Sequence, residues 1–154
     1  FFESELKKES SIDEKLLNAD GKENPFRLHE ELGNIMTDHV TVIRRNKNLA
    51  EADRKIEELL DRFQNVGLSD QGRWANPVLP FARQLFNMLH LAREITVSAL
   101  KRDESRGAQY KPDFPERNAP HWLKTTVAKW AAGQIELSYE AVDTSLLEPR
   151  ERTY

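Results

Sequence analysis

Apolar side chains recur at helical spacing along the first stretch of the chain that shows a clear pattern. This stretch begins at Asn24-Pro25, a capping side chain followed by proline at the first helical position. The pattern predicts a helix over residues 25–38, which the β-branched run of residues 40–43 ends. Gly33 lies inside this helix, where glycine is unfavourable, so we expect a close helix–helix contact there.

A second helix is predicted behind Asn48. With Glu51 three residues later, Asn48 resembles a capping box, and Gly67 is placed to end the helix in the left-handed conformation. The apolar stripe between these signals consists of Leu49, Ala52, Ile56, Leu59, Leu60, Phe63 and Val66.

The third predicted helix is the longest. Asn76-Pro77 repeats the cap-plus-proline start, and the helix should run to about Lys101, a length of roughly 37 Å. Its apolar positions occupy more than one side, so we expect it to be covered on more than one side. Three helices joined by short connections pack as an elongated antiparallel bundle.

After Gly107 the pattern changes from helical to extended. Pro112 and Pro115 force extended backbone at and before them, and residues 123–130 and 135–139 have the pattern of two strands around an Ala-Ala-Gly turn. A lone hairpin is marginally stable in water, so it should pack on the bundle or on another chain. The predicted fold class is therefore mainly α: an elongated antiparallel three-helix bundle followed by an extended segment and a small β-hairpin.

These patterns divide the chain into three predicted regions. We expect residues 1–23 to be a linker from missing upstream domains, because nothing in the local sequence fixes a marginal helix there. Residues 24–106 should form the bundle. Residues 107–154 should form an extended loop, the hairpin and a C-terminal tail packed on the bundle.

Composition removes several classes of chemistry. The 154 residues suit one domain, and the absence of cysteine excludes disulfides, thiolate nucleophiles and iron–sulfur ligation. No two of the six glycines form a G-x-G pair, which excludes a phosphate-cradling loop. A net charge of -3 gives no electrostatic reason to expect nucleic-acid binding. No window approaches the ~20 apolar residues of a membrane span, so we expect a soluble chain that meets a membrane only through a partner.

The histidines do not form a convincing reactive site. His29-Glu30 begins like the zinc motif H-E-x-x-H, but Gly33 occupies the position of the second ligand. His90 and Glu94 are neighbours on one helix face, a spacing that also stabilises ordinary helices. We therefore expect no catalytic, cofactor-binding or metal-binding residue in this chain.

Charge of both signs is concentrated in residues 101–117, just where the long helix should end. A helix C-terminus with basic residues facing its dipole and Gly107 as cap explains only the first half of this segment. A buried polar network at a domain interface would explain all of it, because planar arginine forks hold carboxylates in a fixed geometry.

Three strings in this region resemble a known family: Glu104-Ser105-Arg106-Gly107-Ala108, Asp113-Phe114-Pro115-Glu116-Arg117 and Trp122-Leu123-Lys124-Thr125-Thr126. They are similar to the C-terminal helical domain of succinate dehydrogenase and fumarate reductase flavoprotein subunits, the bacterial succinate dehydrogenase type above all. Residues 28–33, 87–93 and 149–154 add to the likeness, which extends over residues 24–154.

The resemblance implies an FAD-dependent enzyme that oxidises succinate to fumarate and passes electrons through an iron–sulfur subunit to a quinone. In this family a flavin-binding domain and a mobile capping domain lie upstream and hold the catalytic residues. The family also implies a peripheral subunit on the cytoplasmic side of the bacterial membrane, attached through anchor subunits. The present chain would then be inactive alone, carry no FAD, and support the flavin domain and subunit docking.

The resemblance also suggests which residues dock. We expect contacts with the neighbouring domain or subunit from Arg102, Glu104, Ser105, Arg106, Tyr110, Asp113, Arg117, Arg152 and Tyr154. Two departures stand out: Gln109 where the family usually has histidine, and Asn118-Ala119 in place of a common acidic pair. A titrating imidazole is therefore lost at position 109, whereas a hydrogen-bonding role is retained.

Two other interpretations remain open at this point. One is the related helical domain of L-aspartate oxidase, against which the hairpin and the long C-terminal tail argue. The other is a free-standing helical interaction module.

Overall fold

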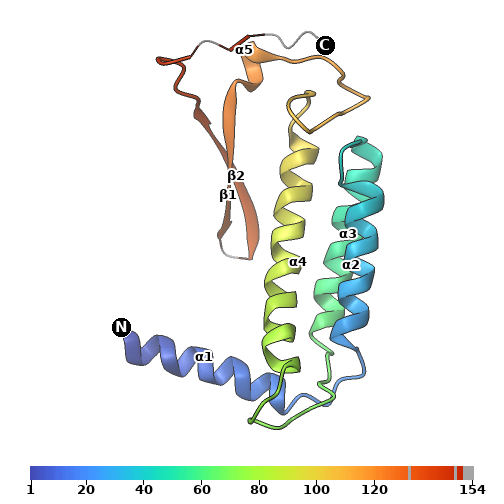
Figure 1. Cartoon of the computed structure of the whole chain (residues 1–154), viewed down its shortest axis with the longest axis vertical. Helices are drawn as coiled ribbons and strands as arrows, with labels where there is room; N and C mark the ends of the chain where they lie inside the picture. Colours follow the sequence, from blue (N-terminus) through green and yellow to red (C-terminus); the bar gives the residue numbers. More distant parts are fainter. Residues whose placement is uncertain (132, 148, 151–154) are drawn as a thin grey trace.

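The computed structural model describes residues 1–131, 133–147 and 149–150. Three long helices run side by side, a further helix projects from one end of them, and a hairpin lies beside the other end (Figure 1). This arrangement confirms the predicted mainly α fold with its β-hairpin. The elements in chain order are α1 (Phe2–Leu17), α2 (Pro25–His39), α3 (Asn46–Phe63), α4 (Val78–Lys101), α5 (Ala119–Trp122), β1 (Lys124–Ala131) and β2 (Gln134–Ala141).

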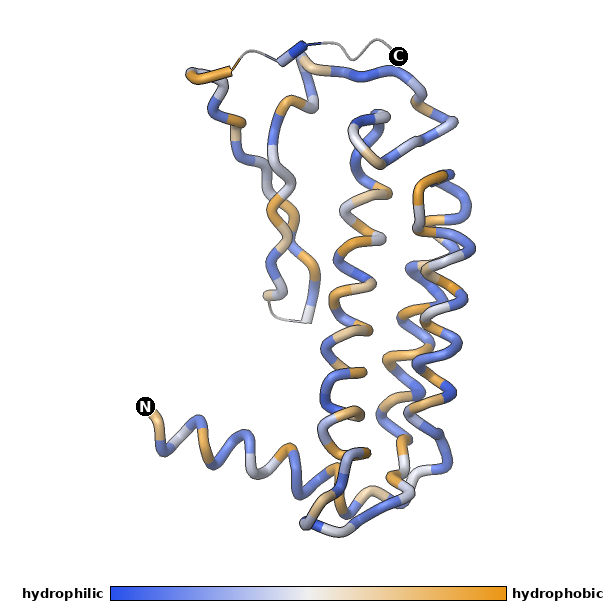
Figure 2. Tube along the Cα trace, in the orientation of Figure 1, coloured by the Kyte–Doolittle hydropathy of each residue, from blue (hydrophilic) through white to orange (hydrophobic). Residues whose placement is uncertain are grey.

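The bundle of α2, α3 and α4 is held by apolar stripes that face one another. Hydrophobic positions recur among hydrophilic ones along each helix (Figure 2), and those that point inward are almost completely buried. Burying each such side chain stabilises the fold by roughly 1.5–3 kcal/mol. The central cluster contains Leu28, Leu32, Ile56, Leu59, Phe63, Val66, Leu85, Leu89 and Ala92.

Asparagine caps begin two of the three helices as predicted. The Asn24 side chain accepts from the backbone N–H of Phe26 at 2.8 Å, and Asn76 Oδ1 accepts from that of Val78 at 2.9 Å. The predicted cap at Asn48 is wrong, because α3 begins at Asn46 with Arg45 at the N-cap position. Its first N–H group is satisfied from a distant part of the chain, as described below, so no local signal marks the true start.

Residues 2–17 form the helix α1, where the sequence had suggested a linker. Its second half is attached to α4: Arg83 donates to Asp13 at 2.9 Å and also pairs with Glu9. Leu17 at its end is buried against the lower end of the bundle. These partners lie about seventy residues away along the chain, which is why the local sequence gave no reason for a fixed helix.

Two glycine predictions are wrong. Gly33 has no atom within 4 Å of the position its Cβ would occupy, so it marks no close helix contact. Gly67 does not end α3, which stops at Phe63. Instead Gly67 lies against Gly21, whose carbonyl oxygen would be 2.1 Å from a Cβ at position 67. The glycine there permits close approach of two backbone segments.

The hairpin forms as predicted, with the first strand shifted by one residue and the second longer than expected at both ends. β1 and β2 pair antiparallel from Lys124 with Ala141 to Ala131 with Gln134, and Gly133 takes a positive φ of 80° at the turn. The tip is fixed to α4 by an edge-to-face contact between Trp130 and His90, with ring centroids 4.5 Å apart. Among the described residues, no helix has the length and apolar character needed to cross a membrane.

Candidate functional site

The carboxylate of Glu104 lies completely buried at the centre of the charged segment. Arg102 donates to it from Nη2 at 2.6 Å, and Arg106 donates from Nε at 2.9 Å and Nη2 at 3.1 Å. The N–H of Asn118 adds a bond of 3.1 Å. Burial alone would raise the pKa of Glu104, but the bonds from Arg106, Asn118 and Arg102 together lower it below its usual value. The predicted arginine-forked network therefore exists.

Arg102 links this carboxylate to the hairpin. Its Nη1 donates to the carbonyl of Lys124 at 3.0 Å and to Thr126 Oγ1 at 3.2 Å, while Nη2 donates to the carbonyl of Trp122 at 2.6 Å. The guanidinium also lies 5.5 Å from the centre of the Trp122 ring. The end of α4 is thus joined to the start of β1 through one side chain.

Lys111 ends α4, a role that the sequence assigned to Gly107. This lysine is completely buried, and its Nζ donates to the carbonyls of Ala99 and Leu100 at 3.0 Å and of Arg102 at 3.1 Å. Asp103 accepts a fourth bond from Nζ at 2.8 Å. Gly107, with a φ of 61°, belongs to a later turn, so its predicted role as cap is wrong. Sequence reasoning missed Lys111 because no fixed spacing identifies a lysine that returns to a helix end.

Three other predicted docking residues fix the loop itself. Ser105 Oγ donates to the carbonyl of Phe114 at 2.9 Å, and Asp113 Oδ2 accepts from the N–H of Asn46 at 2.9 Å, which caps α3. The backbone of Tyr110 pairs with the connection between α2 and α3, where its N–H donates to the carbonyl of Val42 at 3.0 Å. The Tyr110 side chain, 45% exposed, points outward.

The remaining predicted residues lie near the tail. Arg117 Nη1 donates to the carbonyl of Arg150 at 3.3 Å. Arg152 and Tyr154 lie outside the described residues. The structure therefore gathers Arg102, Glu104 and Arg106 in one network and places Arg117 apart from it.

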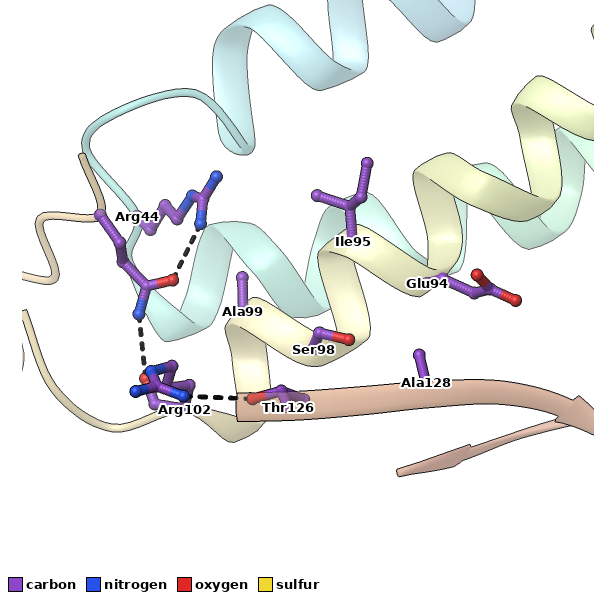
Figure 3. Close-up of a pocket in the computed structure, with 9 residues that line it drawn as sticks. Arg44, Glu94, Ile95, Ser98, Ala99, Arg102, Thr126 and Ala128 are labelled. Atoms are coloured by element: carbon purple, nitrogen blue, oxygen red, sulfur yellow. Dashed lines mark hydrogen bonds between the residues drawn. The ribbon is translucent and has the colours of Figure 1, made fainter. Parts of the chain in front are cut away.

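A pocket of about 320 Å³ opens between α4 and β1, beside this network (Figure 3). Gln109 lines it and is held by three hydrogen bonds: it donates to the carbonyls of Arg102 at 3.2 Å and Glu104 at 3.0 Å, and accepts from Arg44 Nη1 at 2.8 Å. The hydrogen-bonding role expected at position 109 is confirmed. Arg44, like Lys111, was not singled out from the sequence.

The four histidines are distributed over α2, α4 and α5. His90 is packed between Phe86 and Trp130, and burial lowers its pKa. In the described ranges, no group of three or more histidine, aspartate or glutamate side chains is arranged to hold a metal ion. The hydrogen bonds of the charged segment connect the loop and the hairpin to the end of α4, so its observed role is to stabilise the fold.

Comparison with known proteins identifies the family. Residues 29–154 match the family model described as fumarate reductase flavoprotein C-term. The succinate dehydrogenase flavoprotein subunit of Bacillus subtilis is 48% identical over 99% of the chain, and the fumarate reductase flavoprotein subunit of Helicobacter pylori is 35% identical over 86%. The FrdA chain of Escherichia coli quinol fumarate reductase superposes over 99% of the chain with a TM-score of 0.93 at 30% identity.

These relatives are much longer proteins. The chain spans only 26% of the Bacillus subtilis subunit, 19% of the Helicobacter pylori subunit and 26% of the Escherichia coli FrdA chain. The likeness nevertheless extends over α1, the bundle and the hairpin together. It confirms the resemblance seen in the charged strings, and the chain belongs to the family of fumarate reductase flavoprotein C-terminal domains.

Proposed function

We propose that this chain is the C-terminal supporting domain of a succinate dehydrogenase flavoprotein subunit. The single observation that carries the proposal is 48% identity with the Bacillus subtilis succinate dehydrogenase subunit over 99% of the chain. The Helicobacter pylori fumarate reductase subunit is less similar, at 35%. Family membership also favours this proposal over an L-aspartate oxidase domain or a free-standing module.

The intact subunit would oxidise succinate with FAD and pass electrons to an iron–sulfur subunit and a quinone. We assign FAD to upstream domains, because none of the six glycines of this chain form the G-x-G pair of a dinucleotide loop. We further propose that the subunit is peripheral on the cytoplasmic side of the membrane and reaches it through anchor subunits.

The docking face for the upstream domains would be the side of α4 that points away from α2 and α3. Both α1 and the hairpin lie on this side of α4, one toward each end (Figure 1). Leu91 and Ile95 on this side are 56% and 49% exposed, and Leu6 of α1 is 68% exposed. A cleft of about 580 Å³ also lies between α1 and α4. Large exposed apolar patches mark interaction sites, and we propose that these side chains belong to one.

The loop that follows α4, with the network of Arg102, Glu104 and Arg106 and the neighbouring Ser105 and Tyr110, is called the charged corner here. We propose that it makes a second contact with the upstream domains. Arg106 and Tyr110 keep exposed surface there, whereas Glu104 and Ser105 are used inside the domain. We keep the proposal that Arg152 and Tyr154 contact a neighbouring subunit. An Arg106→Ala variant that left flavin retention, assembly and stability of the intact subunit unchanged would contradict the corner contact.

The test of the main docking face is made in the intact subunit. Leu91→Asp should lower the temperature at which bound flavin is released and reduce succinate-dependent dye reduction, because it places a charge in an apolar interface. Thr37→Asp adds the same charge to an exposed position of α2 and should change neither quantity. Equal behaviour of the two variants would overturn the proposal.

A further inference from the structure

Arg44 is a partly buried cation whose hydrogen bonds go only to neutral groups. Its Nε donates to the carbonyls of Val40 at 2.9 Å and Thr41 at 2.8 Å, and its Nη1 donates to Gln109 Oε1 at 2.8 Å. In the part of the chain that the structure describes, Nη2 makes no hydrogen bond and no carboxylate lies within ion-pair distance of the guanidinium. This Nη2 is not a buried atom without a partner, so it is accessible from solvent and free to donate to a ligand.

The other cations near Arg44 are already paired with carboxylates. Arg102 and Arg106 share the single carboxylate of Glu104, and Lys111 is paired with Asp103. Two further carboxylates lie in this region: Glu94 lines the same pocket without an ion pair to Arg44, and Asp113 accepts from the N–H of Asn46. Arg44 is therefore the cation of this group that has no ion pair within the described residues.

Two other arginines of the molecule have their charge balanced by carboxylates. Arg62 binds both Glu31 and Glu23, which raise its pKa, and Arg83 is held by Glu9 and Asp13 with the same effect. For Arg44 the only effect is burial, which lowers its pKa. Arg44 differs from both in being more deeply buried and in having no carboxylate bonded to it among the described residues.

The guanidinium stands at a pocket of suitable size. The space of about 320 Å³ is lined by Arg44 and Arg102 at one end, by the apolar Ile95 and Ala128 along its walls, and by Glu94 (Figure 3). No ion pair joins Glu94 to either arginine within the described ranges. The donors of Arg102 are already used by Glu104 and the hairpin, so it contributes charge rather than a free N–H group.

We propose that this pocket binds one carboxylate group, with Arg44 as the donor and Arg102 as a supporting charge. Two sources offer the same chemistry: a small organic acid, or an aspartate or glutamate side chain of a docked polypeptide. The site itself does not depend on the proposed function, whereas the second source rests on docking in the intact subunit.

The first experiment titrates the 154-residue chain with sodium acetate against sodium chloride at equal ionic strength. The side-chain amide signal of Gln109 and the Nε–Hε signal of Arg44 are followed by NMR. Saturable shifts with acetate but not chloride are expected. Arg44→Gln should raise the apparent Kd for acetate about tenfold or more, as expected for loss of a charged hydrogen bond. Arg45→Gln, at the exposed neighbouring position, should change it less than about twofold.

The second experiment identifies a side-chain source in the intact subunit. Arg44→Lys supplies an amine that a carbodiimide couples to any carboxylate in contact with it, and mass spectrometry then identifies the joined peptide. Arg45→Lys is the control. Coupling specific to the Arg44→Lys variant, to an acidic residue outside the 154-residue chain, would assign the site to a docked side chain.

The outcomes are distinct. Saturable acetate binding that needs Arg44 supports a site for a small acid, and specific coupling to an upstream acidic residue supports a docked side chain. If acetate has no effect and coupling is absent, or reaches only carboxylates of this chain such as Glu94, the proposal is overturned. That result would leave the docking test with Leu91→Asp unaffected.

Discussion

Replacing Lys111 by methionine removes the group that ends α4. The ammonium is completely buried and satisfies the carbonyls of Ala99, Leu100 and Arg102 at 3.0–3.1 Å. Methionine fills a similar volume but donates no hydrogen bond, so all three carbonyls lose a bond from a charged donor. The carbonyl of Ala99 still accepts from the N–H of Arg102, and that of Arg102 still accepts from Gln109, whereas Lys111 is the one donor to the carbonyl of Leu100 among the described residues. Asp103 also loses its cation, but at 42% exposure it stays hydrated.

The size of the effect follows from these contacts. Each lost hydrogen bond from the buried ammonium costs about 1 kcal/mol or more, which gives about 3 kcal/mol for the three. Breaking a buried charged network by removing one member typically costs about 3–5 kcal/mol, which sets the upper value. For a chain of this size each kcal/mol lowers the unfolding temperature by about 2–4 °C. We therefore expect Lys111→Met to lower it by about 6–20 °C.

The assay is thermal unfolding followed by circular dichroism at neutral pH, with urea unfolding as a second measure. Lys101→Met is the matched control, because Lys101 is the exposed last residue of the same helix. It should change the free energy of unfolding by less than about 1 kcal/mol. A difference of less than about 2 °C between the unfolding temperatures of the two variants corresponds to less than about 1 kcal/mol. Such a result would show that Lys111 does not cap α4 as described.

Further substitutions test other parts of the structure. Gly33→Ala should stabilise the chain by about 0.5–1 kcal/mol, since the position is helical and open, whereas Gly67→Ala should destabilise it strongly; urea unfolding compares the two. The pKa of His90 is lowered by burial, so stability should fall as pH drops below about 6.5, together with a change in Trp130 fluorescence that His90→Asn abolishes. The pKa of Glu104 is lowered from 4.5, so its contribution is present above that pH and lost as pH falls further; Glu104→Gln should be less stable at pH 7 yet show a shallower loss in acid-unfolding curves.

The parts of the fold that the sequence predicted depend on local signals. Apolar stripes marked the three bundle helices, and the caps at Asn24 and Asn76 lie within a few residues of the N–H groups they satisfy. The prolines after Gly107 and the alternating pattern of the strands are equally local. Such features can be read from a short window because their physical causes act within it.

The parts that were missed depend on distant partners. α3 begins where Asp113 caps it from sixty-seven residues away, and α1 is held by Arg83. Lys111 and Arg44 act through loops that fold back on helix ends, and no spacing in the sequence signals such a return. The buried network around Glu104 lies in the charged segment that the sequence singled out, and most of its groups bind one another; the docking role of this segment stays a prediction.

The most direct test of the central claim is hydrogen–deuterium exchange of α1 in two contexts. α1 has few tertiary contacts beyond Arg83 and Leu17, so most of its amides should exchange quickly in the 154-residue chain. In the intact flavoprotein subunit, where the upstream domains would cover α1 and the open side of α4, we expect exchange to slow by about tenfold or more. Equal exchange in both contexts would contradict the claim that this domain supports its neighbour through that face.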